Sequence, residues 1–367
     1  MANTEEKRKF YITTPIYYVN AKPHIGSAYT TIAADVLARL HRLLGHETLF
    51  LTGTDEHGAK IAEAAQAAGK KPQEFVDEVS AQFSLAWDIL SIAPDDFIRT
   101  TEPRHKAAVK IFLEKLKESG KLYEGEYEGL YCVGHEAFIK ESDLVDGVCP
   151  DHKTKPELLK EKNWFFKLSD YQDILKKRIE SDEIQIWPQA RKNEVLSFIS
   201  QGLEDTAISR PNVKWGIPLP WDENQTAYVW VEALFNYCSA IGYGADDERY
   251  KKFWPADIHL MGKDIIKFHC VIWPALLLAI KEPTPKAIYA NGFFTSGGQK
   301  MSKSLGNVID PVEWAQKYGP DAVRYFVLRE VPFGQDGDVS EEKFLARYNG
   351  DLANGLGNLF SRLTNMV

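Results

Sequence analysis

The stretch FYITTPIYYVNAKPHIGS, residues 10–27, decides the fold of this chain. Its first part, residues 10–18, is rich in β-branched and aromatic side chains, which predicts a buried strand that ends near Pro15. Pro23 and Gly26 then mark a turn, since these two residues interrupt regular structure most strongly. A buried strand that leads directly into a turn with a flexible glycine is typical of the start of an α/β domain.

The next residues complete a βαβ unit. A helix is expected after the turn, because apolar residues recur at four-residue spacing on one face: Ile32, Val36, Leu40 and Leu44. Gly45 stands where a helix ends in a left-handed residue, and residues 48–51 predict a second strand. Strand, helix and strand in this order indicate a parallel sheet. Ligands of such sheets bind at the carboxyl ends of the strands, which here are residues 18–24 and 54–57.

The rest of the chain divides into segments that differ in composition and in helical periodicity. We assign residues 1–119 to the first half of the α/β domain. Residues 120–225 show little helical periodicity at their start and are interpreted as an inserted module. Residues 226–330 form the second half, with a Gly/Ser/Lys loop at 295–307, and residues 331–367 are expected to be helical.

Composition sets broad limits. The chain has 367 residues, of which 44% are hydrophobic and 26% charged, as in soluble globular proteins. It contains no apolar run of about 18 residues, and its first ten residues have no apolar core, so we predict neither a membrane span nor a secretory signal. Four cysteines do not suggest a disulfide scaffold, which favours the cytoplasm. The net charge of −8 argues weakly against nucleic acid as a partner, although a local basic face is compatible with it.

Two motifs carry the chemistry. In Pro23-His24-Ile25-Gly26-Ser27 an imidazole stands at a helix N-terminus, where backbone N–H groups and the helix dipole favour anions. The second motif runs from Gly298 to Asn307 and contains Lys300 and Lys303 in a loop of serines and glycines. Such a cationic loop is suited to hold a triphosphate and to stabilise the charge of departing pyrophosphate.

Together the two motifs resemble the HIGH and KMSKS signatures of class I aminoacyl-tRNA synthetases. Lys300-Met301-Ser302-Lys303-Ser304 matches the second signature in full, whereas Ser27 stands where the first has its second histidine. The resemblance implies a Rossmann-type parallel-sheet catalytic domain, split by a small zinc-knuckle insertion and followed by the start of an α-helical bundle.

Within this class the chain resembles the methionyl-tRNA synthetases. Its insertion is too short for the editing domain of the isoleucine, valine and leucine enzymes, and the segment before His24 lacks the zinc-binding cysteine of the cysteine enzyme. Further matching segments are Pro15 to Asn20, Thr52 to Gly58, Tyr228 to Trp230, and Gly262-Lys263-Asp264 ahead of Phe268-His269. The resemblance implies activation of L-methionine with ATP and Mg²⁺ and its transfer to tRNA(Met) by a monomer. The alternative is a catalytically silent paralogue of these enzymes that acts as a tRNA-binding or regulatory module.

The resemblance also assigns site residues. The catalytic set is His24, Lys300 and Lys303, and the ATP-binding set adds Gly26, Ser27, Gly262 and Asp264. Methionine is expected to contact Ile16, Tyr18, Asp55, Trp230, Ala233, Tyr237 and His269. Aromatic rings favour a thioether, and a carboxylate accepts hydrogen bonds from an ammonium group. Asp264 is suited to bind ribose hydroxyls or to cap a helix, and Arg210 matches a family position near the active site.

A third motif predicts structural zinc. Cys132 and His135 are separated by two residues, as are Cys149 and His152, and thirteen residues lie between the pairs. Two close pairs of soft ligands fit tetrahedral zinc, and a segment with few apolar residues gains stability from a metal.

The C-terminal segment has room for one or two helices, with apolar residues such as Leu345, Leu352, Leu356, Leu359 and Leu363. In the family a helical bundle that reads the anticodon follows the catalytic domain. We therefore expect an intact adenylation site and a truncated tRNA-recognition surface.

Overall fold

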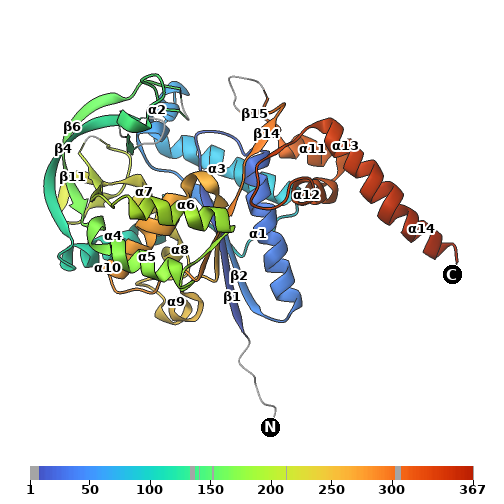
Figure 1. Ribbon diagram of the computed structural model, residues 1–367, viewed down its shortest axis with the longest axis horizontal. Coiled ribbons are helices and arrows are strands. Elements are labelled where there is room, and N and C mark those ends of the chain that lie inside the picture. Colours follow the sequence, from blue (N-terminus) through green and yellow to red (C-terminus); the bar gives the residue numbers. More distant parts are fainter. Residues whose placement is uncertain are drawn as a thin grey trace, which may run out of the picture.

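The computed structural model describes residues 8–132, 137–139, 141–150, 153–211, 213–301 and 307–366. Six parallel strands form its central sheet in the order β3-β2-β1-β12-β13-β7 (Figure 1). They are β1 (Lys9–Tyr18), β2 (Glu47–Asp55), β3 (Asp96–Arg99), β7 (Gln185–Trp187), β12 (Ile258–Gly262) and β13 (Ala287–Asn291). The chain proceeds outward from β1 through β2 to β3 and then returns beside β1 as β12. This reversal confirms the Rossmann-type parallel sheet, with its switch point between β1 and β12.

Helices cover both faces of the sheet because its strands are apolar on both sides. Tyr11 of β1 belongs to one core cluster, with α4 (Pro103–Glu118) and α10 (Trp273–Ala279). Phe10 and Ile12 belong to the opposite cluster, with helices that lie together in Figure 1: α1 (Ile25–Leu43), α3 (Pro72–Ile89), α11 (Pro311–Tyr318) and α12 (Pro320–Arg329). Alternating residues of one strand thus support two cores.

The predicted βαβ unit is confirmed, with two differences. β1 continues to Tyr18, and a register shift between Thr13 and Ile16 accommodates Pro15, which has no N–H to pair. The predicted apolar face of α1 is wrong beyond Ile32, because Val36, Leu40 and Leu44 are 39%, 47% and 61% exposed. The first half of α1 is buried on nearly all sides, whereas its second half contacts the sheet only through the side that carries Ala38 and His41, and His41 stacks on Phe10 of β1. Gly45 has φ +79°, as expected at a helix end.

The segment 120–225 carries small antiparallel sheets and also one strand of the main sheet. One small sheet has the order β5-β4-β6-β8, and the other β10-β11-β9. β7 pairs with β13, so the central sheet takes its last strand from within this segment. The small-sheet strands are β4 (Leu122–Cys132), β5 (Ala137–Ile139), β6 (Glu157–Phe166), β8 (Thr206–Ala207), β9 (Ser209–Arg210), β10 (Pro218–Leu219) and β11 (Asp222–Ala227). Its helices are α5 (Gln172–Glu180) and α6 (Gln189–Ser200).

The second α/β half departs from simple helices. Residues 263–279 are helical throughout, but the hydrogen-bonding pattern changes along them, from a 3-10 turn at Lys263–Ile265 through a π-helical turn at Phe268–Ile272 to α10. The prediction that residues 331–367 are helical is wrong at its start, because β16 (Gly337–Asp338) pairs with β14 (Phe294–Ser296). The remaining elements are α2 (Ala59–Ala67), α7 (Val229–Leu234), α8 (Asn236–Ser239), α9 (Asp247–Phe253), β15 (Gln299–Lys300), α13 (Glu341–Arg347) and α14 (Asn358–Thr364).

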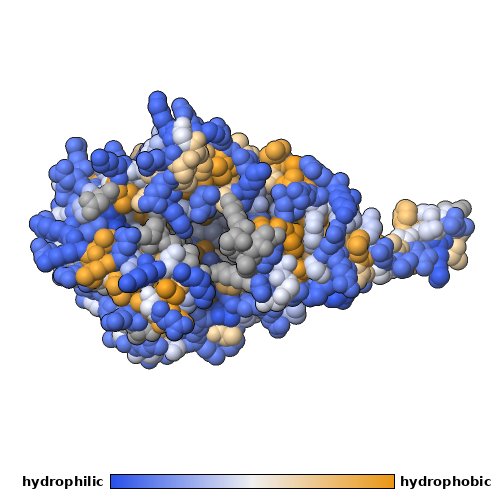
Figure 2. Space-filling model, turned by 90° about the horizontal axis from the view of Figure 1, so that it is seen from above, coloured by the Kyte–Doolittle hydropathy of each residue, from blue (hydrophilic) through white to orange (hydrophobic). Residues whose placement is uncertain are grey.

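The C-terminal helical segment projects away from the body (Figures 1 and 2). Its apolar side chains Leu356, Leu359, Phe360 and Leu363 are exposed. Among the helices of the described residues, none is long and apolar enough to cross a membrane.

Candidate active site

The turn after β1 places His24 at the N-terminus of α1. The backbone N–H groups of Gly26 and Ser27 donate to its Nδ1 at 3.1 and 3.4 Å, so the ring caps the helix. Because Nδ1 accepts these bonds, the neutral ring carries its proton on Nε2. The exposed imidazole therefore offers an N–H donor at the positive end of a helix, where anions bind.

Ser27, which stands where the signature has histidine, completes this cap. Its Oγ accepts from the His24 backbone N–H at 3.0 Å and donates to the His24 carbonyl at 2.7 Å. The hydroxyl proton is thus used inside the turn, and the expected phosphate contact of Ser27 stays a prediction. At Gly26 a Cβ atom would lie 3.0 Å from the His24 ring, so a larger residue would displace the imidazole.

The start of α1 contacts the segment that follows the second signature. Ile25 donates its backbone N–H to the carbonyl of Ile309 at 3.1 Å, which joins the start of α1 to the residues after the second signature. Gly262 ends β12 beside β1 and occupies the N-cap of the next turn, so the alternative that Asp264 caps this helix is wrong. Asp264 is exposed in that turn, at the strand end where ribose-binding carboxylates lie.

The second signature begins on a braced hairpin. β14 and β15 pair through Thr295 and Lys300, and the intervening Gly297 and Gly298 have φ +62° and +74°. Asp338 accepts from the Gly298 N–H at 2.7 Å and from Thr295 Oγ1 at 3.1 Å. These bonds fix the base of the loop to the segment that leads into α13. Lys303 lies outside the described residues, and its role remains a prediction.

Tyr237 and His269, both predicted to bind methionine, form a buried pair. The Tyr237 hydroxyl lies 2.8 Å from His269 Nε2, and His269 Nδ1 lies 3.0 Å from the Ile265 carbonyl. Since a carbonyl only accepts, Nδ1 carries the proton and Nε2 accepts from the hydroxyl. Burial lowers the pKa of His269 to about 4, although the bond to Ile265 opposes this shift. The ring is therefore neutral near pH 7.

The other predicted methionine residues converge on the same side of the sheet. Tyr18 and Asp55 are register partners at the carboxyl ends of β1 and β2. The indole of Trp230 stacks on Phe268 with ring centroids 4.0 Å apart. Partly buried apolar side chains line the edge of one core cluster: Ile16, Tyr18, Trp230, Ile265 and Phe268. Ala233 is buried one turn after Trp230 on α7. A carboxylate and an aromatic wall are thus contributed by separate elements.

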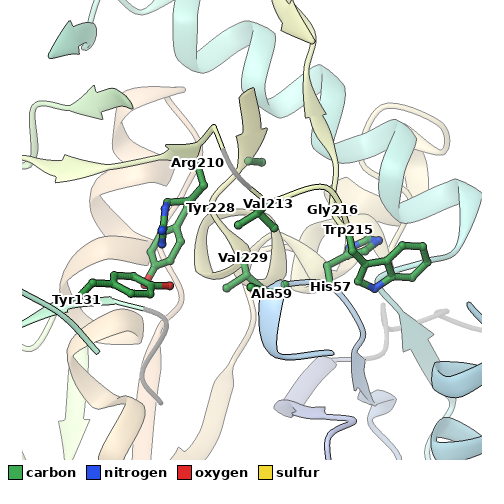
Figure 3. A pocket seen from close by; sticks show the side chains of 11 residues that line it. His57, Ala59, Tyr131, Arg210, Val213, Trp215, Gly216, Tyr228 and Val229 are labelled. Carbon is green, nitrogen blue, oxygen red and sulfur yellow. The ribbon is translucent and has the colours of Figure 1, made fainter. Parts of the chain in front are cut away.

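Arg210 lies in a cleft next to this region. Its guanidinium pairs with both carboxylate oxygens of Glu161, at 2.8 and 3.1 Å, and lies 4.2 Å from the centre of the Tyr131 ring. Figure 3 shows Arg210 and Tyr131 on one side of the cleft and His57 and Trp215 on the other. Arg210 is only 7% exposed, so it is a buried ion-pair partner of Glu161 and not a surface arginine.

The predicted zinc ligands are only half described. Cys132, at the end of β4, and Cys149 are both buried. His135 and His152 lie outside the described residues. Within the described ranges, no cluster of three or more His, Cys, Asp or Glu side chains suited to a metal occurs. Two buried thiols are compatible with a zinc site but do not define it alone.

Sequence reasoning missed the buried polar residues behind the pocket. Glu232 accepts hydrogen bonds from His57 and His105 in the core. The signal was a glutamate inside the apolar stretch Val229 to Leu234, because a buried carboxylate requires partners.

The fold and the two signature segments define the catalytic domain of a class I aminoacyl-tRNA synthetase. The family described as tRNA synthetases class I (M) matches residues 10–155 and 142–364. The chain is 51% identical over 363 residues to a methionine–tRNA ligase of Thermotoga maritima, covering 98% of this chain and 58% of that protein. A methionine–tRNA ligase of Rickettsia conorii is 50% identical, covering 98% of this chain and 70% of that protein.

A solved structure agrees with these relatives. The Mycobacterium tuberculosis methionyl-tRNA synthetase in complex with methionyl-adenylate superposes with a TM-score of 0.95 at 45% identity, covering 98% of this chain and 72% of that one. The chain belongs to the methionyl-tRNA synthetase family, as the short insertion and the further matching segments predicted within the class that the two signatures indicated. It spans 58% of the length of the Thermotoga relative.

Proposed function

We propose that this chain activates L-methionine with ATP and transfers it to the 3′ end of tRNA(Met). A methionine carboxylate oxygen attacks the α-phosphorus of ATP, which forms methionyl-adenylate and releases pyrophosphate. A ribose hydroxyl of the tRNA then attacks the adenylate carbonyl and releases AMP. No covalent bond to the enzyme is required, so the protein acts by positioning and by stabilising charge.

The phosphate side rests on His24 and the two lysines. The Nε2–H of His24 donates to a phosphate oxygen as negative charge moves toward pyrophosphate, at the end of α1 that favours anions. Lys303, assisted by Lys300, neutralises the departing pyrophosphate from the opposite loop. Gly26, Gly262 and Asp264 line the adenosine side, and Mg²⁺ enters as the counter-ion of ATP.

The methionine side rests on a charge and an aromatic wall. Asp55 accepts hydrogen bonds from the substrate ammonium group. Tyr18, Trp230 and His269 surround the thioether, whose polarizable sulfur favours ring contacts. The neutral state of His269 suits this role, since an imidazolium would place a charge against an apolar side chain. Tyr237 keeps the ring oriented, and Ile16 and Ala233 complete the wall.

We also propose a structural zinc ion in the insertion, held by Cys132, His135, Cys149 and His152. The support is the spacing of the two ligand pairs and the burial of both thiols. Elemental analysis of protein purified without chelator should find about one zinc per chain. Substantially less than one equivalent would reject this site. We further propose that the protein is a cytoplasmic monomer.

The observation that carries the proposal is the bond from Ile25, the residue after His24, to Ile309, which follows the second signature in the chain. The test is ATP–pyrophosphate exchange with each of the twenty amino acids in turn. Exchange that depends on methionine alone is expected. Absence of exchange with every amino acid would favour the silent paralogue instead.

A further inference from the structure

A buried charged cluster lies behind the proposed methionine pocket. Glu232 on α7 is fully buried, with His57 Nδ1 2.8 Å from its Oε1 and His105 Nε2 2.9 Å from its Oε2. Both imidazoles are buried as well, 2% and 0% exposed. Because a carboxylate only accepts, each histidine uses a ring N–H on it. The Glu232 carboxylate thus joins the segments of His57 and His105, which are 48 residues apart in the sequence.

The negative charge of Glu232 strengthens its hydrogen bonds to the two histidines. Burial alone would raise the pKa of Glu232, but the two imidazoles outweigh it and lower the pKa below its usual value. Glu232 is therefore ionised, and hydrogen bonds to a buried carboxylate are stronger than those between neutral groups. The loss of either histidine leaves this charge partly unsatisfied.

The His57 branch leads directly to the pocket. Tyr18, a proposed pocket residue, donates its hydroxyl to the His57 carbonyl at 3.1 Å. Asp55 precedes His57 by two residues, and the intervening Glu56 accepts two bonds from Arg99, at 2.7 and 3.0 Å. The segment that carries Asp55 is thus held by Arg99 from β3 and by Glu232 from α7.

The His105 branch stays on the thioether side of the pocket, because it connects α4 and α7 to α8, which also carries Tyr237, and it does not reach the segment of Asp55. His105 lies on α4, and its Nδ1 is 2.8 Å from Ser239 Oγ on α8. This branch joins helices within one core cluster. The two histidines therefore bond the same carboxylate but connect it to different parts of the molecule.

We propose that Glu232 and His57 act as positioning residues that set the separation between the two ends of the methionine pocket. Glu232 stands on the same short helix as Trp230 and Ala233, which contact the thioether end in the proposed function. His57 stands on the segment of Asp55, which binds the ammonium end. The Glu232–His57 bond couples these two walls, so its loss lets the wall of Asp55 shift relative to that of Trp230. The inference rests on the proposed function.

The test compares matched losses of one hydrogen bond to Glu232. In methionine-dependent exchange, His57→Ala should raise the KM for methionine about tenfold, the usual cost of losing a charged buried hydrogen bond, with the KM for ATP within about twofold. His57→Asn retains an N–H near the position of Nδ1 and should recover most of this loss. His105→Ala should lower the melting temperature comparably and leave the methionine KM within about twofold of wild type.

The outcomes separate the two proposals. If the wild-type chain shows no methionine-dependent exchange, the proposed function fails and the positioning inference, which depends on it, fails with it. If the wild type exchanges and His57→Ala keeps the wild-type methionine KM, or His105→Ala raises it equally, the positioning inference alone is overturned. Should His57→Ala fail to fold, Glu232→Gln decides, since it removes the charge and replaces one of the two accepting oxygens by an N–H₂ group that cannot accept a hydrogen bond. A methionine KM unchanged in Glu232→Gln would likewise overturn the inference.

Discussion

Substitution of His24 should separate a structural role of its ring from a catalytic one. Nδ1 caps α1 by accepting from Gly26 and Ser27, whereas Nε2 carries the donor proposed for phosphate. His24→Ala removes both. Loss of an N-cap costs about 1 kcal/mol of folding stability. Loss of one donor that acts mainly in the transition state costs roughly 10²–10³-fold in kcat. The KM for methionine should stay nearly unchanged, because His24 lies on the phosphate side.

His24→Ser is the matched control. A serine hydroxyl caps a helix well, so this variant should be within about 0.5 kcal/mol of wild type in urea unfolding. Its side chain lacks the Nε2 donor, so the loss of kcat in methionine-dependent ATP–pyrophosphate exchange should match that of His24→Ala. If His24→Ser regains the wild-type rate together with stability, the imidazole serves as a cap and nothing more, and the catalytic assignment is refuted.

Three further predictions concern the pocket and the signature hairpin. Trp230→Ala should raise the KM for methionine far more than the KM for ATP, because it removes the ring that stacks on Phe268. Trp230→Phe should retain most of the affinity for methionine. Equal losses for both substrates would mark the ring as structural. Asp338→Ala should raise the KM for ATP about tenfold, because Gly298 loses the hydrogen bond that fixes the base of the loop. An unaltered KM for ATP in exchange kinetics would show that the hairpin does not need Asp338. In the folded protein the pKa of His269 is lowered to about 4, whereas in the unfolded chain it is about 6.5. As the pH drops from 6.5 to 4, the unfolded chain therefore binds a proton that the folded protein does not, and folding stability falls. Melting temperatures at pH 7 and pH 5 should differ less in His269→Gln than in wild type, and an equal difference would contradict this assignment.

The local elements of the first βαβ unit were predictable because their signals are local. The β-branched and aromatic composition of β1, the glycine at the end of α1 and the imidazole at its start depend on neighbours within a few residues. His24 was expected at a helix N-terminus and is found there. The exposed face of α1 after Asp35 could not be predicted, since burial there depends on how far the sheet and α12 extend along the helix.

Other features depended on distant partners. β7 joins the sheet beside β13 although about 100 residues separate them, and its short sequence resembles many exposed strands. β16 is also short and also pairs with a distant strand, β14, so local sequence does not predict it. Ser27, which replaces the signature histidine, was assigned to the ATP-binding set. The structure shows it closing the cap around His24, a role that follows from backbone geometry at the turn.

By itself the sequence determined the class of fold and the family, and it predicted two phosphate-binding signatures and a set of residues for methionine. Tertiary structure alone decided how these residues meet: Tyr237 against His269, Trp230 against Phe268, and Glu232 between His57 and His105. The physical reason is that periodicity and caps act over one or two turns of chain. A buried carboxylate or imidazole is satisfied by whichever donor the packed sheet and helices bring to it, and that partner leaves no mark in the neighbouring sequence.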